Sequence, residues 1–126
     1  HNEIYDPPRD LLASIPGSTV AEMPRNRKRS FCCGAGGARM WMEEKIGTRI
    51  NGNRTEEALA TLTAANGQGG THAIATGCPF CRVMLSDGLT AQQADGAAPE
   101  TTEVLDVAQL LLESVRRAEG RTVTPA

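Results

Sequence analysis

The four cysteines of this chain fall into two tight groups instead of being spread along it. Cys32 and Cys33 are adjacent, and Cys78 and Cys81 form a C-x-x-C sequence well downstream. A disulfide framework in a small secreted domain spaces its cysteines so that each bridge closes a loop. Adjacent cysteines are poorly placed to bridge each other. The pattern favours a reducing compartment and metal or redox chemistry, and it requires a fold that brings two distant segments together.

The composition fits one globular domain. The chain has 126 residues, of which 40% are hydrophobic and 22% charged, and its formal net charge is −2. A chain of this length buries roughly two-thirds of its unfolded surface, which is enough for a core. A mildly negative charge argues against a dedicated nucleic-acid binder, so we expect no nucleic-acid partner. No apolar run approaches the roughly 20 residues of a membrane span, so we expect no membrane contact by this segment itself.

The predicted elements indicate an α/β fold with a small, mostly parallel sheet flanked by helices. Period-2 alternation and short apolar runs predict strands over 18–23, 72–76 and 103–105. Helical spacing and capping residues predict helices over 7–15, 39–47, 53–65, 79–89 and from Asp106 onward. The residues expected in the core are Leu11, Leu12, Val20, Leu59, Ile74, Val83, Val104, Leu111 and Leu112.

Both cysteine pairs follow a predicted strand. In an open α/β sheet the carboxyl ends of the strands form the edge where ligands bind. We therefore expect both cysteine loops at this edge, with Cys32, Cys33, Cys78 and Cys81 gathered as ligands of one site. Cys78 also stands at the start of a predicted helix, whose dipole favours a metal-bound thiolate.

Glycines follow the cysteine pair and suit the same chemistry. Gly34, Gly36 and Gly37 let the backbone approach a bulky centre and offer N–H groups to its sulfides. We expect these glycines to belong to the cofactor-binding site together with the thiols. The stretch is not a dinucleotide-binding fingerprint, because Arg39 stands where the third glycine is required.

The residues alone leave three kinds of site open. Thiolates bind iron–sulfur clusters and zinc, because both are soft, electron-accepting centres. A lone C-x-x-C occurs in zinc sites and in dithiol redox sites alike. An adjacent C-C is less usual for zinc, because neighbouring side chains of extended backbone point apart. Cluster binding is thus the leading hypothesis, and a zinc-binding or dithiol redox module is the alternative.

Two neighbouring segments allow both structural and functional interpretations. The basic residues of segment 25–29 form either a solvated loop or a patch for an acidic electron donor, whose positive charge would raise a cluster's potential. Met40, Trp41 and Met42 either pack in the core and against the site or form an electron conduit, and packing is the expected role.

The two cysteine motifs resemble a known family. The sequences F-C-C-G-A-G-G-A-R-M-W-M-E-E and A-T-G-C-P-F-C-R-V-M-L are similar to the cysteine-rich CCG domain of heterodisulfide reductase. The same domain occurs in the iron–sulfur subunits of glycolate, lactate and glycerol-3-phosphate oxidases. The resemblance runs from His1 to about Leu112. It extends in particular to the C-terminal CCG domain of large actinobacterial iron–sulfur-binding reductases.

This resemblance implies an electron-transfer function. It implies a [4Fe–4S] cluster, cubane or non-cubane, held by Cys32, Cys33, Cys78 and Cys81. In such reductases electrons pass from an electron-transfer flavoprotein towards quinone, so the implied partners are the other domains of the parent reductase and a flavoprotein donor. The implied location is cytoplasmic, on the cytoplasmic face of the membrane in the parent protein.

The chain departs from the family pattern in two ways. The family has a fifth cysteine upstream, just before the segment that begins here at His1. We therefore expect residues 1–118 to be a CCG domain shortened at its N-terminal side, followed by a tail over 119–126. The cluster is expected to be absent or incomplete in this chain, and the fragment alone inactive. The gap between the two cysteine motifs is also long, and segment 66–70 is the predicted insertion.

Overall fold

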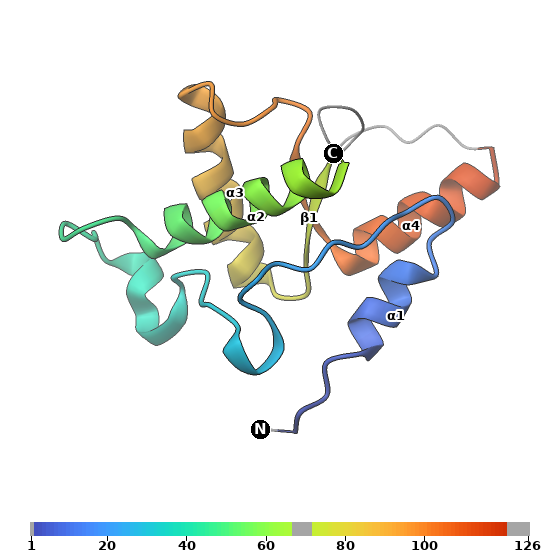
Figure 1. The fold of residues 1–126 in the computed structure, drawn as a ribbon, viewed down its shortest axis with the longest axis horizontal. Coiled ribbons are helices and arrows are strands. Elements are labelled where there is room, and N and C mark those ends of the chain that lie inside the picture. Colours follow the sequence, from blue (N-terminus) through green and yellow to red (C-terminus); the bar gives the residue numbers. More distant parts are fainter. Residues whose placement is uncertain (1, 67–71, 121–126) are drawn as a thin grey trace.

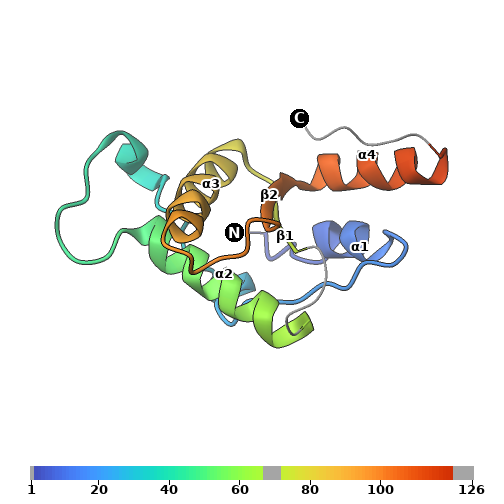
Figure 2. The same cartoon turned by 90° about the horizontal axis from the view of Figure 1, so that it is seen from above.

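The computed structural model describes residues 2–66 and 72–120, in which two parallel strands lie between two pairs of helices (Figures 1 and 2). The elements are α1 (Pro7–Ala13), α2 (Ile50–Asn66), β1 (Ala73–Thr76), α3 (Pro79–Ala94), β2 (Glu103–Asp106) and α4 (Val107–Ala118). Helices α2 and α3 pack together on one side of the sheet, and α1 and α4 pack together on the other. The predicted α/β class with a small parallel sheet flanked by helices is confirmed.

Local sequence signals explain the β1–α3–β2–α4 half of the fold. The two strands pair in parallel over their whole length, with Ala73 opposite Glu103. Helix α4 begins with a capping box at Asp106, whose side chain accepts the N–H of Ala108 at 2.8 Å. The side chain of Gln109 reaches back and accepts the N–H of Asp106 at 3.0 Å. The predicted strands over 72–76 and 103–105 and the helix after Asp106 are thus confirmed.

The predicted strand over 18–23 is wrong, because this segment joins no sheet. Met23 packs against the core, whereas Glu22 forms an ion pair with Arg9 of α1. Any extended segment alternates its side chains in this way, so the period-2 pattern does not require a neighbouring strand. As a consequence the cysteine pair at 32–33 follows no strand, and only the C-x-x-C comes directly after one.

Helix α2 begins earlier than its predicted start at Asn53. The Oε2 atom of Glu44 accepts the N–H of Ile50 at 2.9 Å and satisfies a donor at the helix start. Asn51, in the first turn, is buried and donates to the backbone oxygen of Met84 in α3 at 3.1 Å. These tertiary contacts override the local capping signal at Asn53.

The predicted helix over 39–47 is also wrong. The chain instead forms a 3-10 turn over Gly36–Trp41, and residues 42–49 are not helical. Gly37 and Ala38 have φ values of +64° and +63°, which lie in the left-handed region and break a right-handed helix.

The buried core lies where α2, α3 and the sheet meet. Its members are Cys33, Ala58, Ile74, Met84, Leu85, Leu89, Ala98 and Val104. Ile74 and Val104 were predicted there, and Leu59 packs against them, half-buried. Four other predicted core residues are exposed: Leu11, Val20, Val83 and Leu112. Three of these, all except Val20, lie on helices that a two-stranded sheet covers only in part.

Within the described part of the chain, no helix is long and apolar enough to span a membrane. Two predictions fall on residues outside the described ranges. These are the insertion, beyond its first residue Asn66, and the C-terminal tail from residue 121 onward. Both stay predictions.

Candidate metal centre

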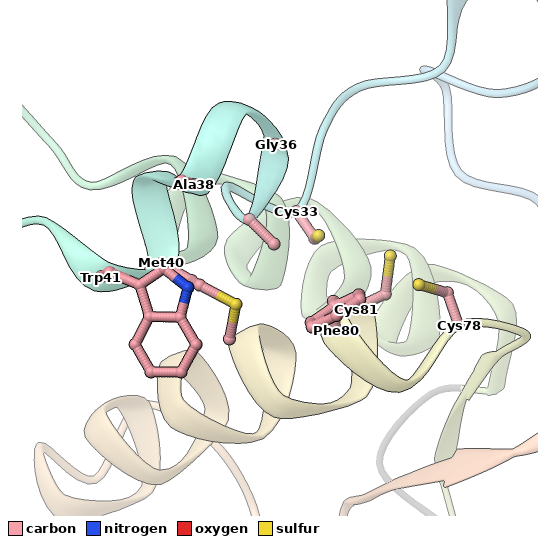
Figure 3. Close-up of a pocket in the computed structure, with 9 residues that line it drawn as sticks. Cys33, Gly36, Ala38, Met40, Trp41, Cys78, Phe80 and Cys81 are labelled. Carbon is pink, nitrogen blue, oxygen red and sulfur yellow. The ribbon is translucent and has the colours of Figure 1, made fainter.

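Three of the four predicted thiols line one open pocket (Figure 3). Cys33 reaches it from the cysteine-pair loop, which is the segment between α1 and α2 that carries Cys32 and Cys33. Cys78 and Cys81 reach it from the start of α3. The cavity has a volume of about 420 Å³, and its wall also includes Met40 and Phe80. The fold therefore brings the two motifs together, although they come from segments far apart in the sequence.

The C-x-x-C half of the site is built by a strand-to-helix junction. Cys78 is the N-cap of α3, with extended backbone, and Pro79 occupies the first helical position, where its missing N–H costs nothing. Cys81 follows three residues later and so lies on the same face of the helix. The backbone N–H groups of Cys81 and Phe80 donate to the sulfur of Cys78, which lowers the pKa of the Cys78 thiol.

The thiol of Cys81 joins the two halves of the site. Burial raises its pKa to about 12, and the sulfur atoms of Cys33 and Cys78 beside it add to the effect. Cys33 is itself only 9% exposed and belongs to the core. Neighbouring buried thiols resist ionisation when they are alone, but a bound cation reverses the balance and deprotonates them.

Cys32 is placed differently from the other three thiols. It is exposed and does not line the pocket. Its sulfur accepts the N–H of Gly34 at 3.3 Å. The backbone N–H groups of Gly34 and Gly36 lower the pKa of the Cys32 thiol, and a contact with the thiol of Cys33 lowers it further. Cys32 therefore sits beside the pocket, next to one of its lining thiols.

The three predicted site glycines do different things. Gly34 is buried with φ +96°, and a Cβ atom there would lie 3.2 Å from Met84 Cε and 3.3 Å from the backbone nitrogen of Asn51. It is needed for the close approach of the cysteine loop to α2 and α3. Gly36 lines the pocket. Gly37 has φ +64° with no atom within 4 Å of a Cβ built on it, so only its backbone conformation calls for glycine.

The expectation that Trp41 and Met42 pack in the core is wrong. Their exposed fractions are 81% and 64%, although Trp41 borders the pocket. Met40 alone of the three is half-buried and packs against the core. The left-handed turn at 37–38 redirects the chain, so the side chains that follow stay on the surface.

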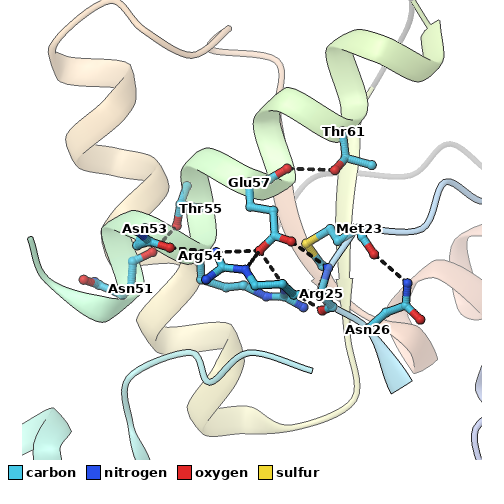
Figure 4. Close-up of polar contacts among 9 residues, drawn as sticks. All are labelled: Met23, Arg25, Asn26, Asn51, Asn53, Arg54, Thr55, Glu57 and Thr61. Carbon is cyan, nitrogen blue, oxygen red and sulfur yellow. Dashed lines mark hydrogen bonds and ion pairs between the residues drawn. The ribbon is translucent and has the colours of Figure 1, made fainter. Parts of the chain in front are cut away.

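Sequence reasoning missed the residues that hold the cysteine-pair loop against α2 (Figure 4). The Oε1 atom of Glu57 accepts the backbone N–H of Arg25 at 2.8 Å, and Oε2 accepts Arg25 Nε at 2.8 Å. Arg54 adds a bond to Oε2 at 2.9 Å. Burial opposes the ionisation of Glu57, but these hydrogen bonds outweigh it and lower the pKa of the carboxyl. The only signal in the sequence was a basic segment ahead of the cysteines.

The rest of that basic segment is engaged at the surface. Arg27 pairs with Asp6 at 2.7 Å, and Lys28 pairs with Glu3 at 2.8 Å. Both pairs are exposed, where an ion pair contributes on the order of 0–1 kcal/mol. Arg25 is therefore bound to α2, whereas Arg27 and Lys28 carry charges that are exposed to solvent.

The donor set fits a thiolate-bound iron–sulfur centre. Three thiols from two segments border one cavity, and the fourth lies beside them. The rest of the cavity wall is mostly apolar, which lowers the local polarity around a bound centre. Among residues 2–66 and 72–120, no three or more His, Cys, Asp or Glu side chains are arranged to hold a single metal ion. The thiols border an open space instead.

The fold and the paired thiols define a cysteine-rich α/β domain with a pocket lined by thiols of both motifs. Residues 1–86 match the family described as the CCG cysteine-rich domain. The chain belongs to this family, as its two cysteine motifs predicted.

The relatives that the chain matches are described as oxidoreductases. The chain is 45% identical over 119 residues to the "Probable iron-sulfur-binding oxidoreductase FadF" of Bacillus subtilis, a match that covers 94% of this chain and 15% of the relative. It is 39% identical over 122 residues to the EtfAB:quinone oxidoreductase of Syntrophomonas wolfei, covering 91% of this chain and 15% of the relative.

A more distant relative comes from an archaeon. The chain is 30% identical over 105 residues to a subunit of the dihydromethanophenazine:CoB–CoM heterodisulfide reductase of Methanosarcina barkeri, covering 83% of this chain and 24% of the relative. No solved structure matches the chain. The chain thus spans about a seventh of the length of its first two relatives.

Proposed function

We propose that this chain is the iron–sulfur-cluster-binding domain of a larger oxidoreductase and that it relays electrons. The observation that carries the proposal is the convergence of Cys33, Cys78 and Cys81 on one pocket, with Cys32 beside it. The names of the relatives support the same function, since they describe iron–sulfur binding and electron transfer between EtfAB and quinone. The small share of these relatives that the chain spans supports its place as one domain among several.

Each group of residues has a defined task in this proposal. The four cysteine thiolates are the ligands, and Cys81 in the apolar wall holds the two motifs together. The amides of Gly34 and Gly36 stabilise negative charge on the sulfur of Cys32. Met40 and Phe80 contribute apolar side chains to the pocket wall. When bound, a [4Fe–4S]-type cluster supplies a site that takes up and releases electrons at a potential set by these surroundings.

The proposal extends to partners and location. The remaining domains of the parent reductase and an electron-transfer flavoprotein are the proposed partners, with electrons passing towards quinone at the cytoplasmic face of the membrane. The fifth cysteine that the resemblance predicts ahead of His1 stays a prediction, as do the domain limits 1–118 and the cluster type, cubane or non-cubane.

Anaerobic reconstitution tests the function. The full-length protein that contains this domain, and a version in which all four cysteines of the domain are changed to serine, are incubated with iron and sulfide. Iron and acid-labile sulfide are then counted and the visible charge-transfer band is recorded. We expect the serine version to lack one cluster relative to the wild type. Equal iron and sulfide in the two proteins would contradict the proposal. One equivalent of zinc that resists iron exchange would establish the zinc module in its place.

A further inference from the structure

The cysteine-pair loop needs an anchor other than a sheet. No strand precedes Cys32 in the described part of the chain, and the cysteine pair lies in a loop between two short 3-10 turns, Arg27–Arg29 and Gly36–Trp41. Irregular segments keep a fixed position only where side chains tie them to regular elements. Ligands of a metal centre require such fixation, because their geometry tolerates little displacement.

Arg25 supplies an anchor of this kind. Its guanidinium lies 3.8 Å from the centroid of the Phe31 ring, and Phe31 immediately precedes Cys32. The same guanidinium donates to Glu57 Oε2 at 2.8 Å and to Asn53 Oδ1 at 2.7 Å, both on helix α2 (Figure 4). The planar guanidinium of Arg25 therefore links the Phe31 ring, next to the cysteine pair, to helix α2.

The backbone of Arg25 is itself held by two hydrogen bonds. Its backbone N–H donates to Glu57 Oε1 at 2.8 Å, and its backbone oxygen accepts from Arg54 Nη1 at 3.0 Å. Arg54 is only 9% exposed, and the side chain of Glu57 is 11% exposed. Partly buried, charge-assisted bonds of this kind hold one geometry more firmly than exposed ion pairs do. Arg27 and Lys28, in the same basic segment, pair with exposed carboxylates.

We propose that Arg25 is a positioning residue for the metal centre: held by Glu57 and Arg54, it fixes Phe31 and thereby places Cys33 opposite Cys81 and Cys32 beside the pocket. This inference rests on the proposed cluster site and adds a residue that touches neither the thiols nor the pocket. Lysine cannot replace arginine in this role, because an ammonium has neither the planar face for the ring nor the fork for the carboxylate.

The test uses the full-length protein with its reconstituted cluster. The variants are R25K, which keeps the charge but loses the planar fork, R25Q, and F31L, which removes the ring. R29Q is the control, because Arg29 is exposed in the same basic segment and its loss changes the net charge equally with R25Q. The measurements are the rate of iron release to a chelator and the electron paramagnetic resonance spectrum of the reduced cluster. Circular dichroism of the metal-free proteins verifies folding.

We expect R25K and R25Q to release iron about 10-fold faster than wild type or more, which is the usual effect of removing a residue that supports a metal ligand. Their resonance spectra are expected to shift, and F31L to lie between them and wild type. R29Q should match wild type in both measurements. Wild-type rates and spectra in R25K, or equal changes in R25Q and R29Q, would overturn the inference while leaving the cluster site intact. A wild-type domain that takes up no cluster would instead overturn the proposed function, and this inference with it.

Discussion

The two cysteine motifs reach the same pocket by different means. Cys78 and Cys81 are placed by regular structure, since β1 ends beside them and α3 begins at Cys78. Cys32 and Cys33 lie on an irregular loop that is held by side chains of α2 and by close packing at Gly34. One half of the site is thus a product of local backbone geometry, and the other half depends on contacts across the chain.

This difference determines how substitutions affect each half of the site. A strand-to-helix junction keeps its geometry as long as α3 stays packed against the sheet and α2. The loop half adds several specific requirements: a glycine at position 34, an ionised Glu57 and an arginine at position 25. We therefore expect helix packing defects to damage the whole site, and single changes at the loop anchors to damage mainly the cysteine pair.

The largest effect is expected where α3 crosses α2. A Cβ atom at Gly88 would lie 2.5 Å from Thr55 Oγ1 and 3.2 Å from the backbone oxygen of Asn51. Thr55 is fully buried and its hydroxyl donates to Asn51 at 2.8 Å, so it has no room to move. We predict that G88A lowers the free energy of unfolding by about 3 kcal/mol, measured by chemical denaturation.

Another helical glycine provides the control for this prediction. A Cβ atom at Gly52 in α2 would have only Thr48 Cγ2 nearby, at 3.9 Å. G52A should therefore raise stability by up to about 1 kcal/mol through helix propensity. If G88A and G52A change stability in the same direction, the close helix crossing does not set the position of α3.

The next effect tests the loop half. We predict that G34A lowers the free energy of unfolding by about 2 kcal/mol, because φ is positive at a crowded position. G37A, with a positive φ in open space, should cost only about 1 kcal/mol. Both variants replace a glycine of positive φ by alanine, and the two positions are three residues apart. The difference between their free energies of unfolding therefore measures the contacts of Gly34 with Met84 and α2. Equal losses would show that the loop does not depend on this packing.

The smallest effect is a pH dependence at the loop anchor. The folded pKa of Glu57 is lowered by its bonds to Arg25 and Arg54, which outweigh burial. Its contribution is therefore complete above the unfolded pKa of about 4.3 and is lost as pH falls through the lower folded pKa. We predict that E57Q is less stable than wild type at pH 7 and that the difference shrinks below about pH 4.

Denaturation midpoints measured across this pH range test the prediction. E56Q, at the exposed neighbouring position of α2, should track wild type throughout. An E57Q deficit that persists unchanged into acid would mean that the carboxylate charge does not tether the loop.

The same contrast explains what the sequence could predict. Cys78 at an N-cap, Pro79 after it and a short apolar run before it are local signals, and they predicted correctly that the C-x-x-C stands between a strand and a helix. Cys33 lies beside the C-x-x-C as expected, with Cys32 next to the pocket, but the strand predicted to place the pair over 18–23 is not formed. The contact between Arg25 and Glu57 spans 32 residues. Such a contact depends on how α2 packs, which no local pattern encodes.

The family resemblance covered what local signals could not. It joined the two cysteine motifs into one site, and the pocket shared by Cys33, Cys78 and Cys81 is consistent with that assignment. It did not indicate that Cys32 would lie outside the pocket lining or that Gly34 and Gly37 would serve the backbone rather than the cavity. These details follow from the left-handed turn and from packing against α3.

Thiols from both motifs are proposed to hold one iron–sulfur centre, and this is the point on which the proposed function depends. The most direct measurement is the iron and sulfide content of four reconstituted full-length variants: C32S, C33S, C78S and C81S. Each variant is compared with wild type under the same anaerobic conditions. We predict that serine at a position in either motif removes most of the iron and sulfide that this domain binds. Full retention of iron and sulfide in both C32S and C33S would show that the C-x-x-C binds without its partner motif, and would contradict a shared centre.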